Sequence, residues 1–445
     1  MSPGAVSFCE GRVNTRGVTW LVGGDRSRRR PCFHATVAAL VLTLLATACG
    51  SSGGGGSGGT PTLKFYVFKE PGGAFAQAAQ ACTQQSGGRY RVVLADLPPS
   101  ADQQREQLVR RLAAHDKDID IMGMDVIWTA EFAEAGWLVP WDGDAAAKAT
   151  EGTIAATVQT GTYKDRLYAA PFTTNTQLLW YRKDRVPTAP TTWAEMVDMA
   201  EQIGDGGRIQ VQGNRYEGLT VWFNSLLASA RGSVLKGPDQ VDLATEPTTR
   251  ALEVMKRVAT SRAADPTLST SQEDQARLAF ESGSSSFMVN YSFVWPSAQK
   301  NAPELAKNMG WAPWPRVLPD EPAHVTLGGI NLGVAAYSRH PQLALDAAAC
   351  LRSAPNQIVA SEKGGLPPTT EALYDEPRVR EAFPFADVMR EMITQGSARP
   401  ISPAYNDVSL AIQRGLHPPR GIDPVKDVKP LRDSIQRSLK SGGLL

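Results

Sequence analysis

The 445-residue chain lacks the sequence motifs of the common catalytic sites. It has no Gly-x-Ser-x-Gly turn between a strand and a helix, no His-Glu-x-x-His and no phosphate-cradling glycine loop. Its five histidines are scattered and show no metal-ligand spacing. The sequence therefore does not predict an enzyme, and it calls for no metal and no cofactor.

An excess of one charge sign is also missing. Lys and Arg number 46, Asp and Glu number 45, and the formal net charge is +1. No long run of like charges follows the first 48 residues, so nothing indicates nucleic-acid binding. No stretch beyond that point reaches the ~18 apolar residues of a membrane-spanning helix. The remaining length suits two domains of ordinary size.

Cysteine is scarce, and the position of one of the five cysteines is informative. Cys49 follows an arginine cluster at 26–30, an apolar run at 35–45 and the small residues 46–48. This order is typical of an export signal. Small residues before a cysteine resemble the lipobox of bacterial lipoproteins, which implies cleavage after residue 48 and acylation of Cys49. The alternative is an ordinary secretory signal with a chance cysteine.

The segment after Cys49 is rich in Gly and Ser up to residue 59. A coil of this composition has a root-mean-square reach of roughly 15–20 Å. We therefore expect a signal peptide at 1–48, and the lipidated cysteine with its flexible linker at 49–61. Cys82 and Cys350 remain, and a pair in an exported protein is interpreted as one disulfide. Two unpaired buried thiols are the alternative.

Folded sequence begins at residue 62. Strand-like segments at 63–68, 90–94 and 119–124 alternate with helix-like segments at 73–84 and 101–114, which predicts an α/β domain with a largely parallel sheet. Ligands bind beyond the carboxyl ends of such strands, where Glu70 and Asp125 stand. Further strands are expected at 178–181, 287–289 and 325–334, and further helices at 193–203, 222–230, 249–261, 275–281 and 341–352.

Four stretches together resemble one family. They are residues 125–137, 167–184, 190–195, and 216–222 with 232–235. Their order and spacing behind a lipobox are similar to those of sugar-binding lipoproteins of ABC importers, over essentially the whole chain after residue 60. Within that family, the amino-acid sequences of residues 125–132, 175–181 and 328–332 are most similar to those of the trehalose-binding lipoproteins of mycobacterial trehalose-recycling importers.

The resemblance implies a two-lobed, periplasmic-binding-protein-like fold, in which each lobe is a mainly parallel sheet flanked by helices. The lobes are discontinuous and joined by a hinge, with 62–172 plus 331–378 in the first and 173–330 plus 379–445 in the second. Cys82 and Cys350 then share a lobe, which favours the disulfide. The implied role is capture of trehalose by a monomer that is lipid-anchored to the outer face of the cytoplasmic membrane. Its partners are a heterodimeric permease and cytoplasmic ATPase subunits.

A neutral sugar needs polar groups for its hydroxyls and flat apolar surfaces for its rings. The residues expected to supply these groups are Asp125, Asn175, Glu273, Tyr291, Gly329 and Arg399, with Glu70 as a weaker candidate. At Tyr291 the related proteins carry Trp, but Tyr can also stack on a sugar.

Each of these residues also has a purely structural interpretation. Asp125 is placed to cap a helix, Asn175 to form a turn and Glu273 to begin a solvated helix. Gly329 suits a β-bulge and Arg399 a surface ion pair.

Three other functions stay open from the sequence. A maltose-type sugar or another oligosaccharide would suit the same family. A glycoside hydrolase would use Asp125 with Glu273 or Glu70 as its two carboxylates. An exported adhesion protein would bind no small sugar in a saturable way.

Overall fold

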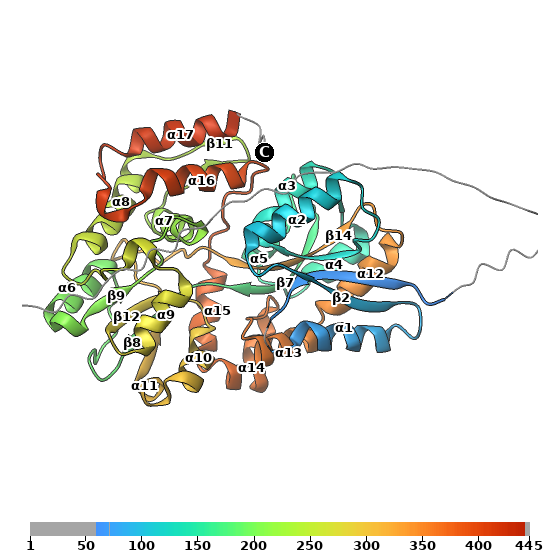
Figure 1. The fold of residues 1–445 in the computed structure, drawn as a ribbon, viewed down its shortest axis with the longest axis horizontal. Coiled ribbons are helices and arrows are strands. Elements are labelled where there is room, and N and C mark those ends of the chain that lie inside the picture. The colour runs from blue at the N-terminus through green and yellow to red at the C-terminus, as the bar shows by residue number, and fades with distance from the viewer. Residues whose placement is uncertain (1–58, 71, 441–445) are drawn as a thin grey trace, which may run out of the picture. The chain divides into compact units, whose positions relative to one another are not determined.

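The computed structural model describes residues 59–70 and 72–440 (Figure 1). These residues belong to one compact unit, Ser57–Leu445. The predicted signal peptide, the acylation site at Cys49 and the linker as far as residue 58 lie outside the described residues. The described chain builds two sheets, each flanked by helices, which confirms the predicted α/β class.

The first sheet has the strand order β2-β1-β3-β14-β4, and β7 also pairs with β14. Parallel pairing joins β1 to β2 and β1 to β3, whereas β14 is antiparallel to β3, β4 and β7. The strands are β1 (Thr62–Phe68), β2 (Arg91–Leu97), β3 (Ile121–Asp125), β4 (Leu138–Val139), β7 (Ala169–Asn175) and β14 (Gly328–Ala335).

The second sheet has the order β13-β8-β12-β9. Here β12 is parallel to β9, and β8 is antiparallel to both β12 and β13. The strands are β8 (Leu178–Arg182), β9 (Arg208–Gln210), β12 (Ser285–Asn290) and β13 (Met309–Ala312). Two small hairpins complete the strands: β5 (Thr162–Tyr163) with β6 (Arg166–Leu167), and β10 (Leu235–Lys236) with β11 (Gln240–Val241).

The sheets are mixed, so the prediction that each is mainly parallel is wrong. Parallel pairing in the first sheet is confined to β1, β2 and β3, which crossover helices connect. The strand β14 returns to this sheet after the whole second sheet has been built, and it enters in the opposite direction. The alternation of strands and helices over 62–125 carries no information about such a late strand.

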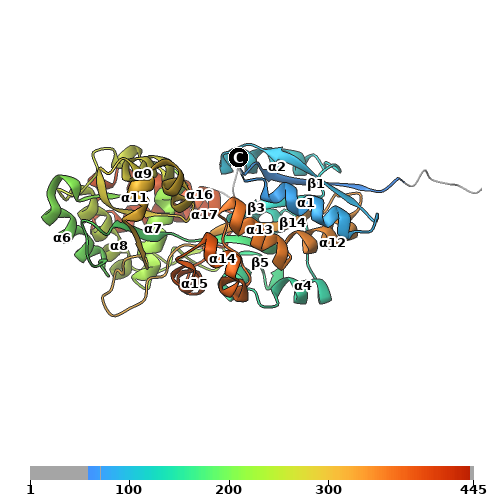
Figure 2. The ribbon, with the colours of Figure 1, turned by 90° about the horizontal axis from the view of Figure 1, so that it is seen from below.

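Helices cover both faces of the first sheet (Figure 2). One core joins this sheet to α1 and α12, and another joins it to α2 and α3. The helices of this region are α1 (Ala74–Gln85), α2 (Ala101–Ala113), α3 (Thr129–Glu134), α4 (Gly143–Thr150), α5 (Ala155–Thr160), α12 (Pro341–Leu351) and α13 (Ala354–Gly364). The disulfide between Cys82 and Cys350 links α1 to α12, with the two Cα atoms 5.8 Å apart.

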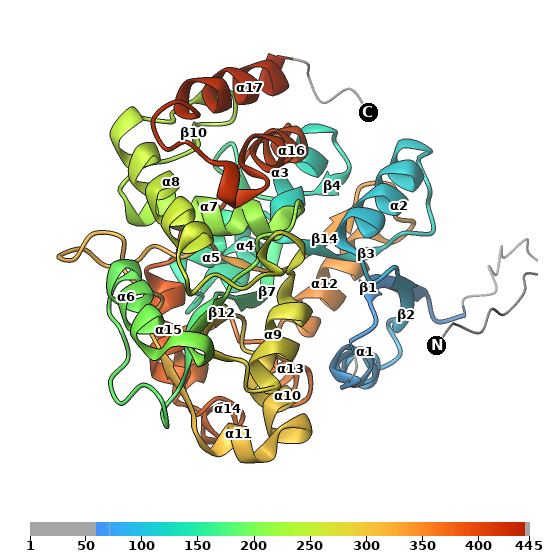
Figure 3. The same ribbon diagram turned by 60° about the vertical axis from the view of Figure 1, so that its left-hand side comes forward.

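The second sheet has its own large core. Figure 3 shows α16 and α17 packed against α7 and α8 beside it, as their contacts also indicate. The helices here are α6 (Trp193–Ile203), α7 (Glu217–Ser229), α8 (Thr245–Thr260), α9 (Glu273–Glu281), α10 (Val294–Asn301), α11 (Pro303–Lys307), α14 (Pro377–Ala382), α15 (Ala386–Thr394), α16 (Tyr405–Leu416) and α17 (Val428–Lys440). The residue boundaries given above for the two lobes stay a prediction.

Local sequence explains where α6 begins. The Thr192 side chain accepts a hydrogen bond from the Glu195 backbone N–H at 3.1 Å. The Glu195 carboxylate in turn accepts from the Thr191 backbone N–H at 2.7 Å. The first bond satisfies a backbone donor of the first turn and the second fixes the residue before the cap, so the helix starts at Trp193 as predicted.

Within residues 59–70 and 72–440, no helix is both long and apolar enough to cross a membrane. The same residues contain no group of three or more His, Cys, Asp or Glu side chains that could hold a metal ion.

Candidate functional site

A cavity of about 1140 Å³ is lined by residues at the ends of β3, β7 and β14 and by residues of α7, α9 and α16. Pockets for small molecules usually measure about 300–1,000 Å³, so this one is large enough for a disaccharide with water. Six of the seven predicted site residues line it: Asp125, Asn175, Glu273, Tyr291, Gly329 and Arg399. These residues come from six separate parts of the chain.

Asp125 is the last residue of β3, at the carboxyl end where the sheet rule expects a ligand group. Its Oδ1 accepts a hydrogen bond from the Ile127 backbone N–H at 3.2 Å and so caps the short 3₁₀ turn that follows. The same oxygen accepts from Arg399 Nη2 at 3.0 Å. Asp125 therefore both caps the turn and lines the cavity.

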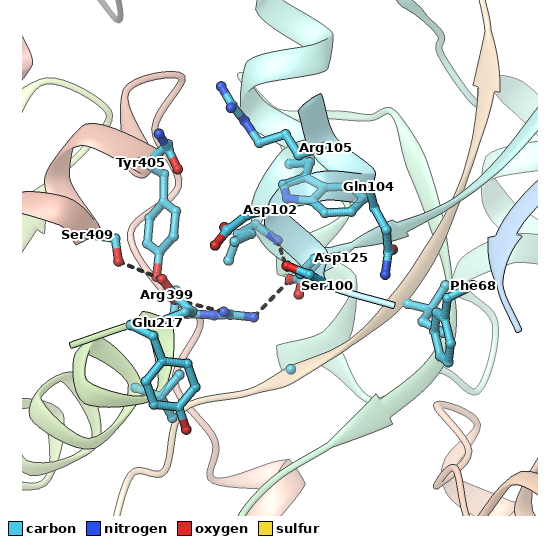
Figure 4. Close-up of a pocket in the computed structure, with 18 of the residues that line it drawn as sticks. Phe68, Ser100, Asp102, Gln104, Arg105, Asp125, Glu217, Arg399, Tyr405 and Ser409 are labelled. Carbon is cyan, nitrogen blue, oxygen red and sulfur yellow. Dashed lines mark hydrogen bonds and ion pairs between the residues drawn. The ribbon is translucent and has the colours of Figure 1, made fainter. Parts of the chain in front are cut away.

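Arg399 lies between two carboxylates. Its Nη1 donates to Glu217 Oε1 at 3.0 Å and its Nη2 to Asp125, as the dashed lines in Figure 4 show. The side chain is only 5% exposed, so the interpretation as a surface ion pair is wrong. Burial lowers the pKa of Arg399, but the charges of Asp125 and Glu217 outweigh burial and hold the pKa above its usual value. Its Nε is buried without a hydrogen-bond partner.

Glu217 was not expected from the sequence, yet several donors converge on it. It is the first residue of α7, where the helix dipole favours an anion. Ser409 donates to its Oε2 at 2.5 Å, and Tyr405 and Arg399 donate to its Oε1. Burial raises the pKa of Glu217, and the charge of Arg399 partly opposes this rise.

Asn175 and the glycine pair at the start of β14 form the floor of the cavity. Asn175 lines the cavity, and its Oδ1 is buried without a hydrogen-bond partner. A Cβ on Gly328 would lie 2.1 Å from that oxygen, and a Cβ on Gly329 would lie 2.3 Å from the Thr173 carbonyl oxygen. Gly329 also has φ +129°, a value that favours glycine. A register shift follows between Ile330 and Asn331, so a bulge and a place in the cavity again coincide.

Glu273 and Tyr291 lie next to each other because Asn290 joins them. Asn290 is fully buried; its Nδ2 donates to the Glu273 carbonyl oxygen at 3.0 Å, and its Oδ1 accepts from the Tyr291 backbone N–H at 2.9 Å. Tyr216 also lines this corner. Burial, followed by the charge of Glu273, raises the pKa of the Tyr216 and Tyr291 hydroxyls. Burial likewise raises the pKa of the Glu273 carboxyl.

The wall formed by α2 contributes a second pair of opposite charges. Arg105 Nε donates to Glu131 Oε2 at 2.7 Å, and its Nη2 donates to Glu131 Oε1 at 2.5 Å. Phe68, at the end of β1, adds an aromatic surface (Figure 4). The cavity thus combines polar groups with aromatic faces, the combination that a sugar requires.

Glu70 is not among the lining residues. It is 6% exposed, and its carboxylate accepts hydrogen bonds from the Gly72 backbone N–H at 2.6 Å and the Phe75 backbone N–H at 3.3 Å. Both donors lie at the start of α1, whose orphan N–H groups need an acceptor. In this structure Glu70 therefore organises the entry to α1, away from the cavity.

Some of the missed residues left a signal in the sequence. Tyr405 and Ser409 are four positions apart, which places them on one face of a helix. Glu217 lies inside a stretch that carried the family resemblance, but its partners are 182 to 192 positions away. Only the folded chain brings these groups together.

Known proteins are similar to this chain in sequence and in architecture. Residues 68–358 match the model of the family described as bacterial extracellular solute-binding protein. A protein of Deinococcus radiodurans described as a probable ABC transporter-binding protein is 28% identical over 361 residues, covering 77% of this chain and 84% of its own.

Solved structures extend the likeness to the whole fold. The maltose-bound MalE3 of T. maritima superposes with a TM-score of 0.74 at 28% identity, covering 84% of this chain and 99% of that one. The GacH receptor of Streptomyces glaucescens, solved unliganded and with acarbose, gives a TM-score of 0.73 at 21% identity over 86% and 99% of the two chains. The two-lobed architecture predicted from the sequence is that of these neighbours. On the family match over 68–358, this chain belongs to the bacterial extracellular solute-binding proteins.

Proposed function

We propose that this chain captures a neutral disaccharide, trehalose in the first instance, and delivers it to an ABC permease for uptake. The observation that carries the proposal is the buried Arg399 held between the partly exposed carboxylates of Asp125 and Glu217, in a cavity that also presents aromatic side chains. Sugar hydroxyls both donate and accept, so they can bridge carboxylates and a guanidinium, and such charge-assisted bonds are the stronger ones.

Trehalose is proposed from the resemblance of the sequence stretches at 125–132, 175–181 and 328–332. In the proposed complex, Asp125, Asn175 and Arg399 bind hydroxyls, Glu273 binds a further hydroxyl, and Tyr291 lies along a ring face. Gly329 would face the sugar with its backbone, since a Cβ there would lie 2.3 Å from the Thr173 carbonyl oxygen of β7. Closure of the two lobes about a hinge would bury the ligand, as a population shift toward the closed form.

Location and partners belong to the same proposal. Acylation of Cys49 would anchor the chain to the outer face of the cytoplasmic membrane, where it acts as a monomer. The closed, loaded form would dock on a two-subunit permease, and cytoplasmic ATPase subunits would drive transport. No enzymatic step is assigned to the site.

A maltose-type ligand is the second candidate. It is favoured by the likeness, at 28% identity, to a structure described as maltose-bound. Maltose has the same composition as trehalose and differs in its linkage, so a small change in the placement of hydrogen-bonding groups would decide between them.

The test is isothermal titration calorimetry of the full-length protein with trehalose, maltose and glucose. A detergent without a sugar headgroup is required, since a maltoside could occupy the site. Saturable binding of trehalose alone is the expected result. Binding of maltose alone would replace the ligand but keep the role. Binding of none of them, or steady release of monosaccharide from a disaccharide, would contradict the proposal.

A further inference from the structure

The cationic side chains that line the cavity are already neutralised. Arg399 is paired with Asp125 and Glu217, each at 3.0 Å, and Arg105 is held by both oxygens of Glu131. The third lining arginine, Arg110, is paired with Glu106 one turn away. The lining set contains no lysine and no histidine. Among the described residues, therefore, no free cation awaits an anionic ligand in this cavity.

Two of the carboxylates that line the cavity, unlike its arginines, have no partner of opposite charge within the part of the chain that the structure describes. Glu273 and Asp102 both line the cavity, and neither belongs to an ion pair formed among the described residues. Burial raises the pKa of the Glu273 carboxyl, the like charges of Asp274 and Glu217 raise it further, and hydrogen bonding from Tyr216 lowers it. One corner of the site is thus anionic and lacks a counter-charge.

That corner also carries aromatic rings. Tyr216 and Tyr291 line the cavity beside Glu273. Burial, followed by the charge of Glu273, raises the pKa of each tyrosine hydroxyl. The buried Asn290 fixes the backbone of Glu273 against that of Tyr291 through two hydrogen bonds, so the corner is preorganised. A carboxylate with adjacent aromatic faces suits an ammonium group, because the ion pair and the attraction of a cation to ring faces add together.

We infer that the site selects its ligand by charge: it accepts neutral and amine-bearing saccharides, with the amine at Glu273 between Tyr216 and Tyr291, and it rejects saccharides that carry a carboxylate or phosphate. The inference rests on the proposed function and specifies the substrate class of the same site. Rejection follows because an anion would have to break an existing ion pair or lie beside unpaired carboxylates.

The experiment compares three forms of one disaccharide: the neutral parent, an amino-deoxy derivative and a uronic-acid derivative. Each is titrated by calorimetry into the full-length protein, at a pH where the amine is protonated and the acid ionised. The parent is whichever of trehalose and maltose binds. We expect the amine to bind at least as tightly as the parent and the acid to bind at least about tenfold more weakly. An acid that binds as tightly as the parent, or an amine that binds tenfold more weakly, would overturn the inference.

Two variants assign the effect to Glu273. In Glu273→Gln the ratio of amine affinity to parent affinity should fall about tenfold. Glu246→Gln removes the same charge from a side chain that is 71% exposed and does not line the cavity, so the ratio should stay as in the parent protein. An equal fall in both variants would overturn the assignment to this corner. If the neutral parent binds but the charged forms follow the opposite order, only this inference fails; if no form binds, the proposed function fails with it.

Discussion

Arg399 Nη2 lies 3.0 Å from Asp125 Oδ1, although the two residues are 274 positions apart in the chain. The guanidinium reaches Glu217 Oε1 at the same distance on its other side. Asp125 ends a strand of the first sheet, and Glu217 begins a helix that packs beside the second. One arginine therefore connects the two halves of the cavity, and several expectations depend on it.

Replacing Arg399 with Ala should weaken disaccharide binding by at least about 1.5 kcal/mol, because a ligand hydroxyl loses its charge-assisted hydrogen bond and is left unpaired in the site. Asp125→Ala should cost at least as much for the corresponding reason. Arg399→Lys keeps the charge but loses the two-pronged fork, so an intermediate loss is expected. Calorimetric titration of each variant measures these differences.

Arg378→Ala is the matched control for these variants. Arg378 is paired with Glu362, its side chain is 53% exposed, and it does not line the cavity. Its removal should leave the dissociation constant unchanged. Near-normal affinity in both Asp125→Ala and Arg399→Ala would place the binding site elsewhere.

Glu217→Gln should change how stability depends on pH. Burial raises the pKa of Glu217 in the folded protein, whereas a Glu carboxyl in the unfolded chain has a pKa of about 4.3. The folded protein therefore holds a proton that the unfolded chain has lost, and its free energy of unfolding decreases as pH rises from about 4.3 through the folded pKa. The glutamine variant lacks this titration, so its stability should decrease less over the same interval.

Urea unfolding at a series of pH values measures this effect as the difference between variant and parent protein. Glu246→Gln is the control, since Glu246 is 71% exposed and pairs with Arg250 on the surface of α8. A difference between Glu217→Gln and the parent that stays constant with pH would contradict the expectation.

The disulfide should contribute to stability but not to binding. It closes a separation of 268 residues, and removal of a native disulfide typically costs about 2–5 kcal/mol. The double replacement Cys82→Ser with Cys350→Ser avoids leaving a lone thiol. Neither cysteine lines the cavity, so ligand affinity at a temperature well below unfolding should equal that of the parent protein. Denaturant unfolding and calorimetry on the same sample separate the two properties, and weakened binding with unchanged stability would reverse this assignment.

Local sequence signals located the early strands and helices of the first sheet, but they did not predict β4 or β7. The strand expected at 63–68 is β1 and the helix expected at 101–114 is α2, each within one residue at its ends. Apolar periodicity and a helix cap determine such elements from neighbours in the chain. Late pairings such as β14 with β3 depend on contacts across the fold, and for that reason the antiparallel direction was missed.

The candidate site shows the same division. Six residues named from the sequence share one cavity, because family-like stretches and strand ends identify the backbone positions that face a ligand. The partners of those residues were missed. Tyr405 and Ser409 lie on α16, for which no helix was expected, although buried residues recur there at Val408, Ile412 and Leu416 with a helical period. Glu70 lies outside the lining of the cavity because a residue past a strand end can instead accept hydrogen bonds from the backbone that leads into the next helix.

Gly329→Ala should disrupt the floor of the cavity. Its φ of +129° is strained for any residue with a side chain, and the new Cβ would lie 2.3 Å from the Thr173 carbonyl oxygen. Strain of this kind costs about 1–3 kcal/mol, and separating β14 from β7 to relieve it would also displace Asn175. We expect lower stability together with weaker sugar binding. Gly421→Ala is the matched control, because no atom lies within 4 Å of its new Cβ and the residue is remote from the cavity. If Gly329→Ala keeps the parent's unfolding midpoint and affinity, the close approach of β7 and β14 at this position does not exist in solution.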